Sequence, residues 1–330
     1  MSWKVLVILT TIMVITSLSG CINKPEKVVK IVGKKLTFES ISEAIEKATD
    51  GDVILIGEGT YHEKLKINKT ITLKGKGPDR TIIDSEGPGC IIYITADWVN
   101  ITGIAVTSSG EKTASAGIWI KSNNNTIANN KISGNIENAI YLQTAHWNNI
   151  TNNEISENKA RGIYLYSSSN NTISFNLITG NGEGIYGRYS TNNSIFSNTI
   201  SSNTLHGIYF TTFSNNNIIR DNVISHNNYG LWIKASQHNL IVSNLIASNQ
   251  KGIYFCCNGK NNLVYNNIFM NNTEWNAKGY PINQWDNGSS GNYWDDYNGT
   301  DADGDGIGDT PYIIGEGNED RYPLMRPHSS

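Results

Sequence analysis

Short apolar segments alternate with polar ones along the chain, and the pattern repeats every 22 to 24 residues from about residue 117 to residue 272. Aliphatic residues return in register, and so do pairs of a small and an aliphatic residue such as Gly162-Ile163. Two sets of asparagines keep the same steps. They are Asn130, Asn153, Asn176, Asn198, Asn222, Asn244 and Asn267, and Asn135, Asn158, Asn181, Asn203, Asn227, Asn249 and Asn272. A repeat of this length indicates a solenoid.

Each repeat unit has the pattern of short β-strands, because apolar and polar residues alternate between Asn, Ser and Gly positions and no ten-residue stretch has helical spacing. A leucine-rich repeat would show its own leucine signature, and a tetratricopeptide unit would be longer and helical. The pattern therefore predicts an all-β parallel β-helix of about nine or ten coils, with equivalent residues stacked at about 4.8 Å. Isoleucines would fill the interior, and asparagine amides would bond from coil to coil at the turns.

One amphipathic helix is expected ahead of the first coil. Ser40 and Glu43 resemble a capping box, and the residues that follow Ser40 form an apolar stripe. The stripe consists of Ile41, Ala44, Ile45 and Ala48. Such a helix would cover the end of the solenoid core, which is otherwise open to water.

Residues 38–84 resemble the opening of right-handed β-helix proteins. The resemblance rests on Ala44-Ile45-x-x-Ala48, Gly51-Asp52-Val53-Ile54, Gly59-Thr60-Tyr61 and Thr81-Ile82-Ile83-Asp84. The Gly-Ile-Tyr and Asn-x-Ile repeats that follow resemble the carbohydrate-binding and sugar-hydrolase repeat family, often labelled NosD-like after a periplasmic protein of copper-site maturation. The resemblance covers residues 36 to about 277 and implies a right-handed β-helix, but it says little about function because the shared residues are structural.

An aromatic residue is expected on the outside of seven consecutive coils. In Gly-Ile-Tyr-Leu the two aliphatic residues point to one face and the residue between them to the other. The predicted column is Trp119, Tyr141, Tyr164, Tyr186, Tyr209, Trp232 and Tyr254. A second outward column is Lys121, Gln143, Tyr166, Arg188, Thr211, Lys234 and Cys256.

The predicted aromatic column has two interpretations. A long exposed strip of aromatic rings is typical of a binding surface, and rings flanked by polar groups suit sugars. The alternative is that the tyrosines only stabilise the strands by stacking on one another. We therefore expect non-catalytic binding of a polysaccharide or a cell-envelope glycan.

Catalysis is the alternative function, as a polysaccharide lyase, epimerase or hydrolase. Arg161, Glu183 and His206 occupy equivalent places on successive coils and are expected about 5 Å apart. With Arg188 nearby to bind a carboxylate, they could perform acid–base chemistry on an acidic sugar. An ion-pair ladder is the preferred interpretation, since hydrolysis usually needs two facing carboxylates and Glu183 has no evident partner. No catalytic residue is assigned.

A copper-maturation role is a third hypothesis, suggested only by the family label. The soft ligands of the repeats fall in different columns and have no recognised metal-ligand spacing. These residues are Cys256, Cys257, Met270, His226 and His238. The sequence gives no support for copper.

The amino end resembles a lipoprotein signal peptide. Lys4 precedes an apolar stretch over residues 5–15, and Leu18-Ser19-Gly20-Cys21 resembles a lipobox. The resemblance implies a signal peptide over residues 1–20, a lipid on the Cys21 sulfur, and a protein tethered to the outer face of the cytoplasmic membrane. An uncleaved anchor is the alternative, and both export the rest of the chain. A polar linker is expected over residues 21–35.

Charge is unevenly distributed along the chain. The net charge is −3, charged residues make up 17%, and polarity comes largely from 45 asparagines, so nothing indicates a nucleic-acid partner. Residues 286–320 contain ten carboxylates and no lysine or arginine. We therefore expect a β-helix over residues 36–280 and a separate acidic cap over residues 281–330.

The acidic cap contains a pattern typical of a calcium loop. The expected ligands are Asp301, Asp303, Asp305, Asp309 and the carbonyl of Ile307. Tyr312 stands where an EF-hand has its bidentate glutamate, so the run more closely resembles dockerin-like or thrombospondin-type repeats. The stretch from Asn292-Tyr293-Trp294 to Pro311 also resembles the ends of archaeal cell-surface β-helix proteins. The sequence predicts a calcium-stiffened cap.

Overall fold

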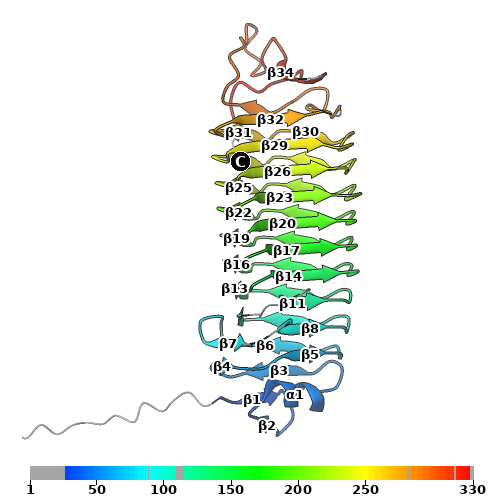
Figure 1. The fold of residues 1–330 in the computed structure, drawn as a ribbon, viewed down its shortest axis with the longest axis vertical. Helices are drawn as coiled ribbons and strands as arrows, with labels where there is room; N and C mark the ends of the chain where they lie inside the picture. Colours follow the sequence, from blue (N-terminus) through cyan, green and yellow to red (C-terminus); the bar gives the residue numbers. More distant parts are fainter. Residues whose placement is uncertain are drawn as a thin grey trace, which may run out of the picture.

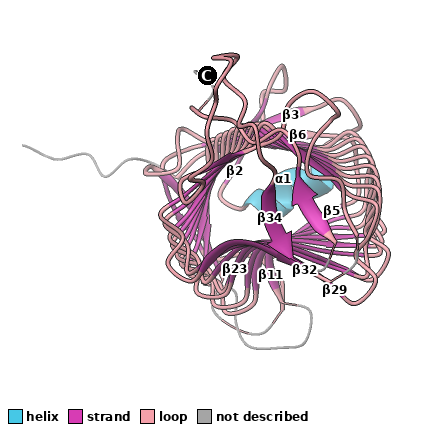
Figure 2. Ribbon diagram, turned by 90° about the horizontal axis from the view of Figure 1, so that it is seen from above, coloured by secondary structure: helices cyan, strands magenta, loops and turns pink. Residues whose placement is uncertain are grey.

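The computed structural model describes residues 27–85, 87, 89–108, 115–280, 282–315 and 317–327. The predicted signal peptide and Cys21 lie outside these residues. The described chain winds into a rod of stacked coils, with a helix at one end and irregular loops at the other (Figure 1). Three sheets run the length of the rod and enclose its core, as the view down the axis shows (Figure 2). The predicted all-β parallel β-helix of about ten coils is confirmed.

The first sheet has twelve strands, all parallel except at its amino-terminal edge, where β1 pairs antiparallel with β2 and β3. In spatial order they are β2 (Thr37–Phe38), β1 (Val29–Ile31), β3 (Val53–Ile56), β6 (Thr72–Lys74), β9 (Asn100–Thr102), β12 (Thr126–Ala128), β15 (Asn149–Thr151), β18 (Thr172–Ser174), β21 (Ser194–Phe196), β24 (Ile218–Arg220), β27 (Leu240–Val242) and β30 (Leu263–Tyr265). The linker expected over residues 21–35 is therefore shorter, because β1 belongs to the solenoid.

The second sheet has eleven parallel strands. They are β4 (Gly59–Tyr61), β7 (Thr81–Asp84), β10 (Ala105–Thr107), β13 (Lys131–Ser133), β16 (Glu154–Ser156), β19 (Leu177–Thr179), β22 (Thr199–Ser201), β25 (Val223–Ser225), β28 (Leu245–Ala247), β31 (Ile268–Met270) and β33 (Tyr293–Trp294). The β33 strand lies beyond residue 280, so the sheet continues into the segment expected to be a separate cap.

The third sheet has ten parallel strands, several of them six residues long. They are β5 (Leu65–Ile67), β8 (Ile92–Ile94), β11 (Ala116–Ile120), β14 (Asn138–Gln143), β17 (Arg161–Tyr166), β20 (Glu183–Arg188), β23 (His206–Thr211), β26 (Tyr229–Lys234), β29 (Lys251–Cys256) and β32 (Trp275–Gly279). This ten-stranded sheet carries the aromatic column. A short antiparallel pair, β34 (Tyr312–Gly315) and β35 (Asn318–Asp320), completes the described strands.

Isoleucine columns fill the core, as the repeat predicts. One column is fully buried and in exact register from coil to coil. Its members are Ile132, Ile155, Ile178, Ile200, Ile224 and Ile246. The small residue before each strand-centre aliphatic is needed for space: a Cβ on Gly184 would lie 2.4 Å from the Gly207 carbonyl oxygen and 2.7 Å from Ile200 Cγ2.

Asparagine ladders hold the turns together. Asn176 donates from its backbone N–H and its Nδ2 to Oδ1 of Asn198, at 3.0 and 2.9 Å, and Asn198 donates in the same way to Asn222. Both predicted asparagine sets form such ladders, and a third set was not predicted. It consists of Asn125, Asn148, Asn171, Asn193, Asn217, Asn239 and Asn262. Each ladder amide bonds backbone groups that the bends would leave unpaired.

Both ends of the described core are covered. The predicted helix is α1 (Ile41–Lys47). Ser40 is the N-cap of this helix, and its side-chain oxygen accepts a hydrogen bond from the backbone N–H of Glu43. The helix start is also capped by Glu63, which accepts the backbone N–H groups of Ile41 and Ser42 at 2.9 Å. At the other end Trp285 and Trp294 are 1% exposed and close the last coil. Within the described residues, no helix has the length and apolarity needed to cross a bilayer.

Candidate functional site

The aromatic column lies on the outer face of the ten-stranded sheet, one ring on each coil. The strand register places all seven predicted residues opposite one another, while the residues on either side of them in sequence are buried in the core. Tyr93 on β8 extends the column by one coil. The predicted column is therefore present as a single line along the rod.

The rings of this column pack against one another. Successive ring centroids lie 4.8 to 5.6 Å apart, and Tyr141 and Tyr164 stack with 11° between their planes. Most of the rings are half-buried, so the column offers ring rims more than open faces. The sequence predicts a long exposed strip of rings, and this expectation is corrected: the rings partly cover one another, because a coil spacing of about 4.8 Å suits ring-to-ring packing.

The phenol groups of the column are neutral hydrogen-bonding groups. Burial raises the pKa of Tyr164 to about 12 and also raises the pKa of Tyr141, Tyr186 and Tyr209. A tyrosine hydroxyl both donates and accepts hydrogen bonds, and these hydroxyls stay protonated at neutral pH. They suit the recognition of sugar hydroxyls better than the removal of a proton.

Arg161, Glu183 and His206 lie together beside the column as a ladder of an Arg161–Glu183 ion pair and a Glu183–His206 contact, close to the preferred interpretation. Glu183 accepts from Nε of Arg161 at 2.8 Å, and its other oxygen lies 3.1 Å from Nδ1 of His206. Glu183 and His206 are each 8% exposed. The Arg161 guanidinium stacks over the rings of Tyr164 and Tyr186 at 4.8 and 4.4 Å. Both carboxylate oxygens of Glu183 are therefore engaged. Because Glu183 holds the Arg161 guanidinium in place over the two rings, the ladder stabilises the position of these rings on the sheet.

Arg188 is separated from this ladder. It lies at the far end of β20 from Glu183, about 16 Å away at the usual rise per residue. Its guanidinium lies 5.1 Å from the centre of the Tyr189 ring, in the turn that follows the strand. The structure therefore brings together three of the four residues considered for catalysis.

An exposed aromatic group that the sequence did not predict lies beside Arg188. Tyr189 is 38% exposed and Phe213 is 62% exposed, and their rings stack at 6.5 Å. Tyr166 meets Tyr189 edge-on at 6.0 Å. Tyr189 and Phe213 occupy left-handed turn positions with φ of 54° and 58°. The available signal was an aromatic residue in the turn that follows each of two successive strands. The two turns differ in length, so the two aromatic residues do not stand at equivalent positions of the repeat.

The acidic loop brings three of its predicted calcium ligands together. Carboxylate oxygens of Asp301, Asp303 and Asp305 lie within 4.8 Å of one another. Asp301 also accepts backbone N–H groups from within the loop, which fixes its carboxylate there. The Asp309 carboxylate accepts the N–H of Ala302 at 2.9 Å and the Thr300 hydroxyl at 3.1 Å. Three clustered carboxylates fit a hard cation such as calcium, whereas Asp309 supports the loop.

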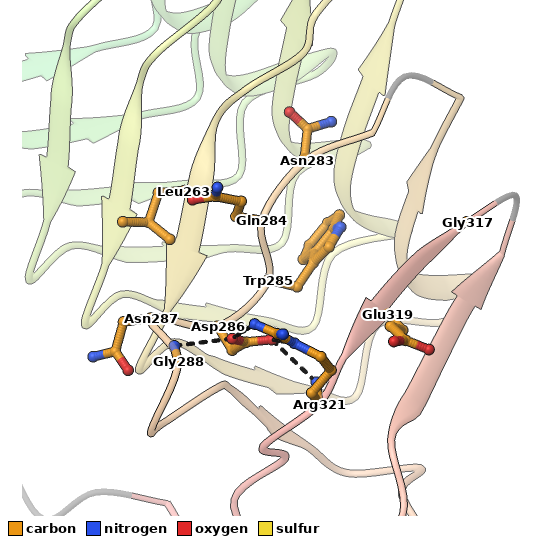
Figure 3. Close-up of a pocket in the computed structure, with 10 residues that line it drawn as sticks. All are labelled: Leu263, Asn283, Gln284, Trp285, Asp286, Asn287, Gly288, Gly317, Glu319 and Arg321. Carbon is orange, nitrogen blue, oxygen red and sulfur yellow. Dashed lines mark hydrogen bonds and ion pairs between the residues drawn. The ribbon is translucent and has the colours of Figure 1, made fainter.

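A pocket of about 460 Å³ lies between the last coil and the β34–β35 pair (Figure 3). Arg321 donates to both carboxylate oxygens of Asp286, at 3.0 and 2.6 Å, and the N–H of Gly288 donates to the same carboxylate at 2.9 Å. Burial favours a higher pKa for Asp286, but these donors outweigh it and lower the pKa. Asp286 and Arg321 are thus committed to each other and join two segments of the cap, while Glu319 also lines the pocket.

Comparison with known proteins identifies the family. A family model described as the right-handed β-helix region matches residues 116–269 and 211–294, which together make up more than half of the chain. The chain belongs to the right-handed β-helix family. The handedness expected from the resemblance follows from this membership.

One relative of this β-helix is a cell surface glycoprotein of Methanothermus fervidus. It is 32% identical over 136 residues, a match that covers 38% of this chain and 21% of the glycoprotein. The chain thus spans about a fifth of the length of the relative that it matches.

Several solved structures share the fold of this β-helix at low identity. The A-module of the Azotobacter vinelandii mannuronan C-5 epimerase AlgE6 has a TM-score of 0.53 at 13% identity, with coverage of 76% of this chain and 86% of that module. The ORF18 protein of Geobacillus virus E2 has a TM-score of 0.61 at 14% identity, covering 77% and 58% of the two chains. The Dettilon tailspike protein has a TM-score of 0.55 at 16% identity, covering 73% and 58%. These likenesses concern the fold.

Proposed function

We propose that this β-helix is an exported cell-surface protein that binds a polysaccharide or a cell-envelope glycan without turning it over. The observation that carries the proposal is the unbroken aromatic column on the outer face of the ten-stranded sheet. Its ring rims can contact the C–H groups of sugars while the tyrosine hydroxyls exchange hydrogen bonds with sugar hydroxyls. The relative named as a cell surface glycoprotein supports the location, and the epimerase named for mannuronan supports a glycan ligand.

Binding is preferred to catalysis because the acid–base candidates are otherwise engaged. Glu183 is buried and bonded through both oxygens, and burial raises the pKa of Tyr164 in the column to about 12, further above neutral pH. We also propose that the protein is tethered to the membrane through a lipid on Cys21, on the strength of the lipobox pattern.

Replacing Tyr186 and Tyr209 together with serine is expected to abolish retention on an insoluble polysaccharide or cell-wall preparation. The two rings occupy the middle of the column, and their loss opens a gap of two coils in the contact surface. The measurement is a pull-down of the purified protein, with circular dichroism to check that the β signal is unchanged.

The matched control replaces Leu177 and Val223 with serine, since these two exposed apolar residues lie on the outside of the eleven-stranded sheet. The control protein should be retained like the wild type. Unchanged retention of the tyrosine variant would contradict the proposal. Release of sugar products during the assay, lost on changing Glu183 to glutamine, would favour an enzyme instead.

We further propose that the acidic loop binds calcium through Asp301, Asp303 and Asp305. Millimolar calcium should raise the unfolding temperature of the cap and protect residues 295–311 from proteolysis, because the cation offsets repulsion among the three carboxylates. Changing Asp303 to asparagine should weaken the effect, whereas changing the exposed Asp221, which pairs with Arg220, should not. Indifference of the wild type to both calcium and chelator would refute the site.

A further inference from the structure

The outer face of the ten-stranded sheet is basic, although the chain as a whole carries a net charge of −3. Its strands contain six basic residues and one acidic residue, Glu183. The basic residues are Lys66, Arg161, Arg188, Lys234, Lys251 and Lys278. The aromatic column therefore runs through a surface with a positive excess.

Part of this positive charge is not neutralised within the described chain. Arg161 pairs with Glu183, and Lys251 lies 3.7 Å from Glu274. The ion pairs between described residues do not include Arg188 or Lys234. These two side chains belong to one column and are two coils apart, about 10 Å along the rod. They are available to pair with charges on a ligand.

Arg188 is set among the most open rings of this face. Its guanidinium lies over the Tyr189 ring, and the Phe213 ring, 62% exposed, stacks with Tyr189 at 6.5 Å between centroids. In the central column the rings cover one another, whereas here open aromatic surface adjoins an exposed cation. This combination can hold a sugar ring against Phe213 while the guanidinium pairs with a carboxylate or sulfate on the sugar.

We propose that the glycan bound by this β-helix is anionic, and that Arg188, Tyr189 and Phe213 form a subsite for one acidic sugar. Lys234 contacts a second negative charge further along the glycan. The inference rests on the proposed glycan binding and adds the class of glycan to it. Charge complementarity carries it: the sheet face that bears the aromatic column holds exposed cations without a described carboxylate partner.

The test compares binding of the full chain to polygalacturonate, dextran sulfate and a neutral glucan, measured by calorimetry at low and high salt. We expect binding to one or both anionic polymers, at least about tenfold weaker binding to the neutral glucan, and loss of affinity with salt. Changing Arg188 to glutamine should weaken anionic binding by about 10- to 100-fold, the usual range for a charge-assisted hydrogen bond. The two anionic polymers distinguish recognition of a carboxylate from recognition of a sulfate.

The matched control changes Arg220 to glutamine. Arg220 also lies over an aromatic ring, that of Phe196 at 4.3 Å, but on the twelve-stranded sheet, and this variant should bind like the wild type. A second variant, Phe213→Ser, should weaken binding without changing its salt dependence. Equal affinity for the neutral glucan would overturn the inference while leaving glycan binding intact. Equal affinity for double-stranded DNA would overturn it in favour of a general polyanion surface, and failure to bind any polysaccharide would refute the proposed function itself.

Discussion

Replacing Asn198 with alanine is expected to destabilise the rod by about 3–5 kcal/mol, which is among the largest effects that a single substitution produces. The buried Asn198 amide accepts two hydrogen bonds from Asn176 and donates to Asn222, to the Ile173 carbonyl and to the Phe196 carbonyl. Alanine removes all of them. Water cannot replace them readily because the ladder lies inside the turn, where Asn198 is 1% exposed.

Equilibrium unfolding in urea measures this loss, with Thr199→Ala as the control. Thr199 is the adjacent residue on the same coil but points to solvent, so its change should stay within about 0.5 kcal/mol. Because a solenoid coil contacts only its neighbours, the Asn198 variant can also split the transition into two. Equal unfolding midpoints for the two variants would show that the ladder amides are energetically replaceable.

The repeat explains why much of this molecule could be predicted. Stacked coils place equivalent residues in one line, so the sequence period determines the isoleucine core, two asparagine ladders, the aromatic column and the Arg161–Glu183–His206 contact. Contacts that do not follow the period could not be obtained in this way. Glu63 caps α1 from a later turn, and β1 joins the first sheet antiparallel.

The candidate site was only partly predictable for the same reason. The period places the rings of the column on the outer face, but whether they offer faces or rims depends on side-chain packing. Tyr189 and Phe213 occupy turns of unequal length, since the ladder step from Asn171 to Asn193 is 22 residues and the next is 24. Both rings precede the next ladder asparagine by four residues, but they follow the strand glycines Gly184 and Gly207 by five and six residues. Aligning the repeats on their strands therefore does not align these two rings.

The stability of the cap is expected to depend on pH through Asp320, the acidic residue that ends the asparagine ladder of Asn267 and Asn292. Asp320 is fully buried and accepts from the N–H of Asn292 at 2.7 Å and from Nε1 of Trp294 at 2.9 Å. Burial raises the pKa of Asp320 from 3.8 to about 6, although these donors favour the charged form. The folded cap therefore holds a proton on Asp320 in a pH range where the unfolded chain has released it.

The sign of the effect follows from this difference in proton binding. The contribution of Asp320 to the free energy of unfolding is fully present below about pH 4, declines as the pH rises toward 6, and is constant above that. A pKa shift of this size corresponds to a total change of about 3 kcal/mol. The lowered pKa of Asp286 acts in the opposite direction but only below about pH 4, so the two windows are separate. Urea unfolding of the cap, followed by tryptophan fluorescence between pH 4 and pH 7.5, should show a falling midpoint. In Asp320→Asn, which cannot titrate, this decline should vanish, and a wild type whose midpoint rises across the same range would show that the hydrogen-bond donors outweigh burial.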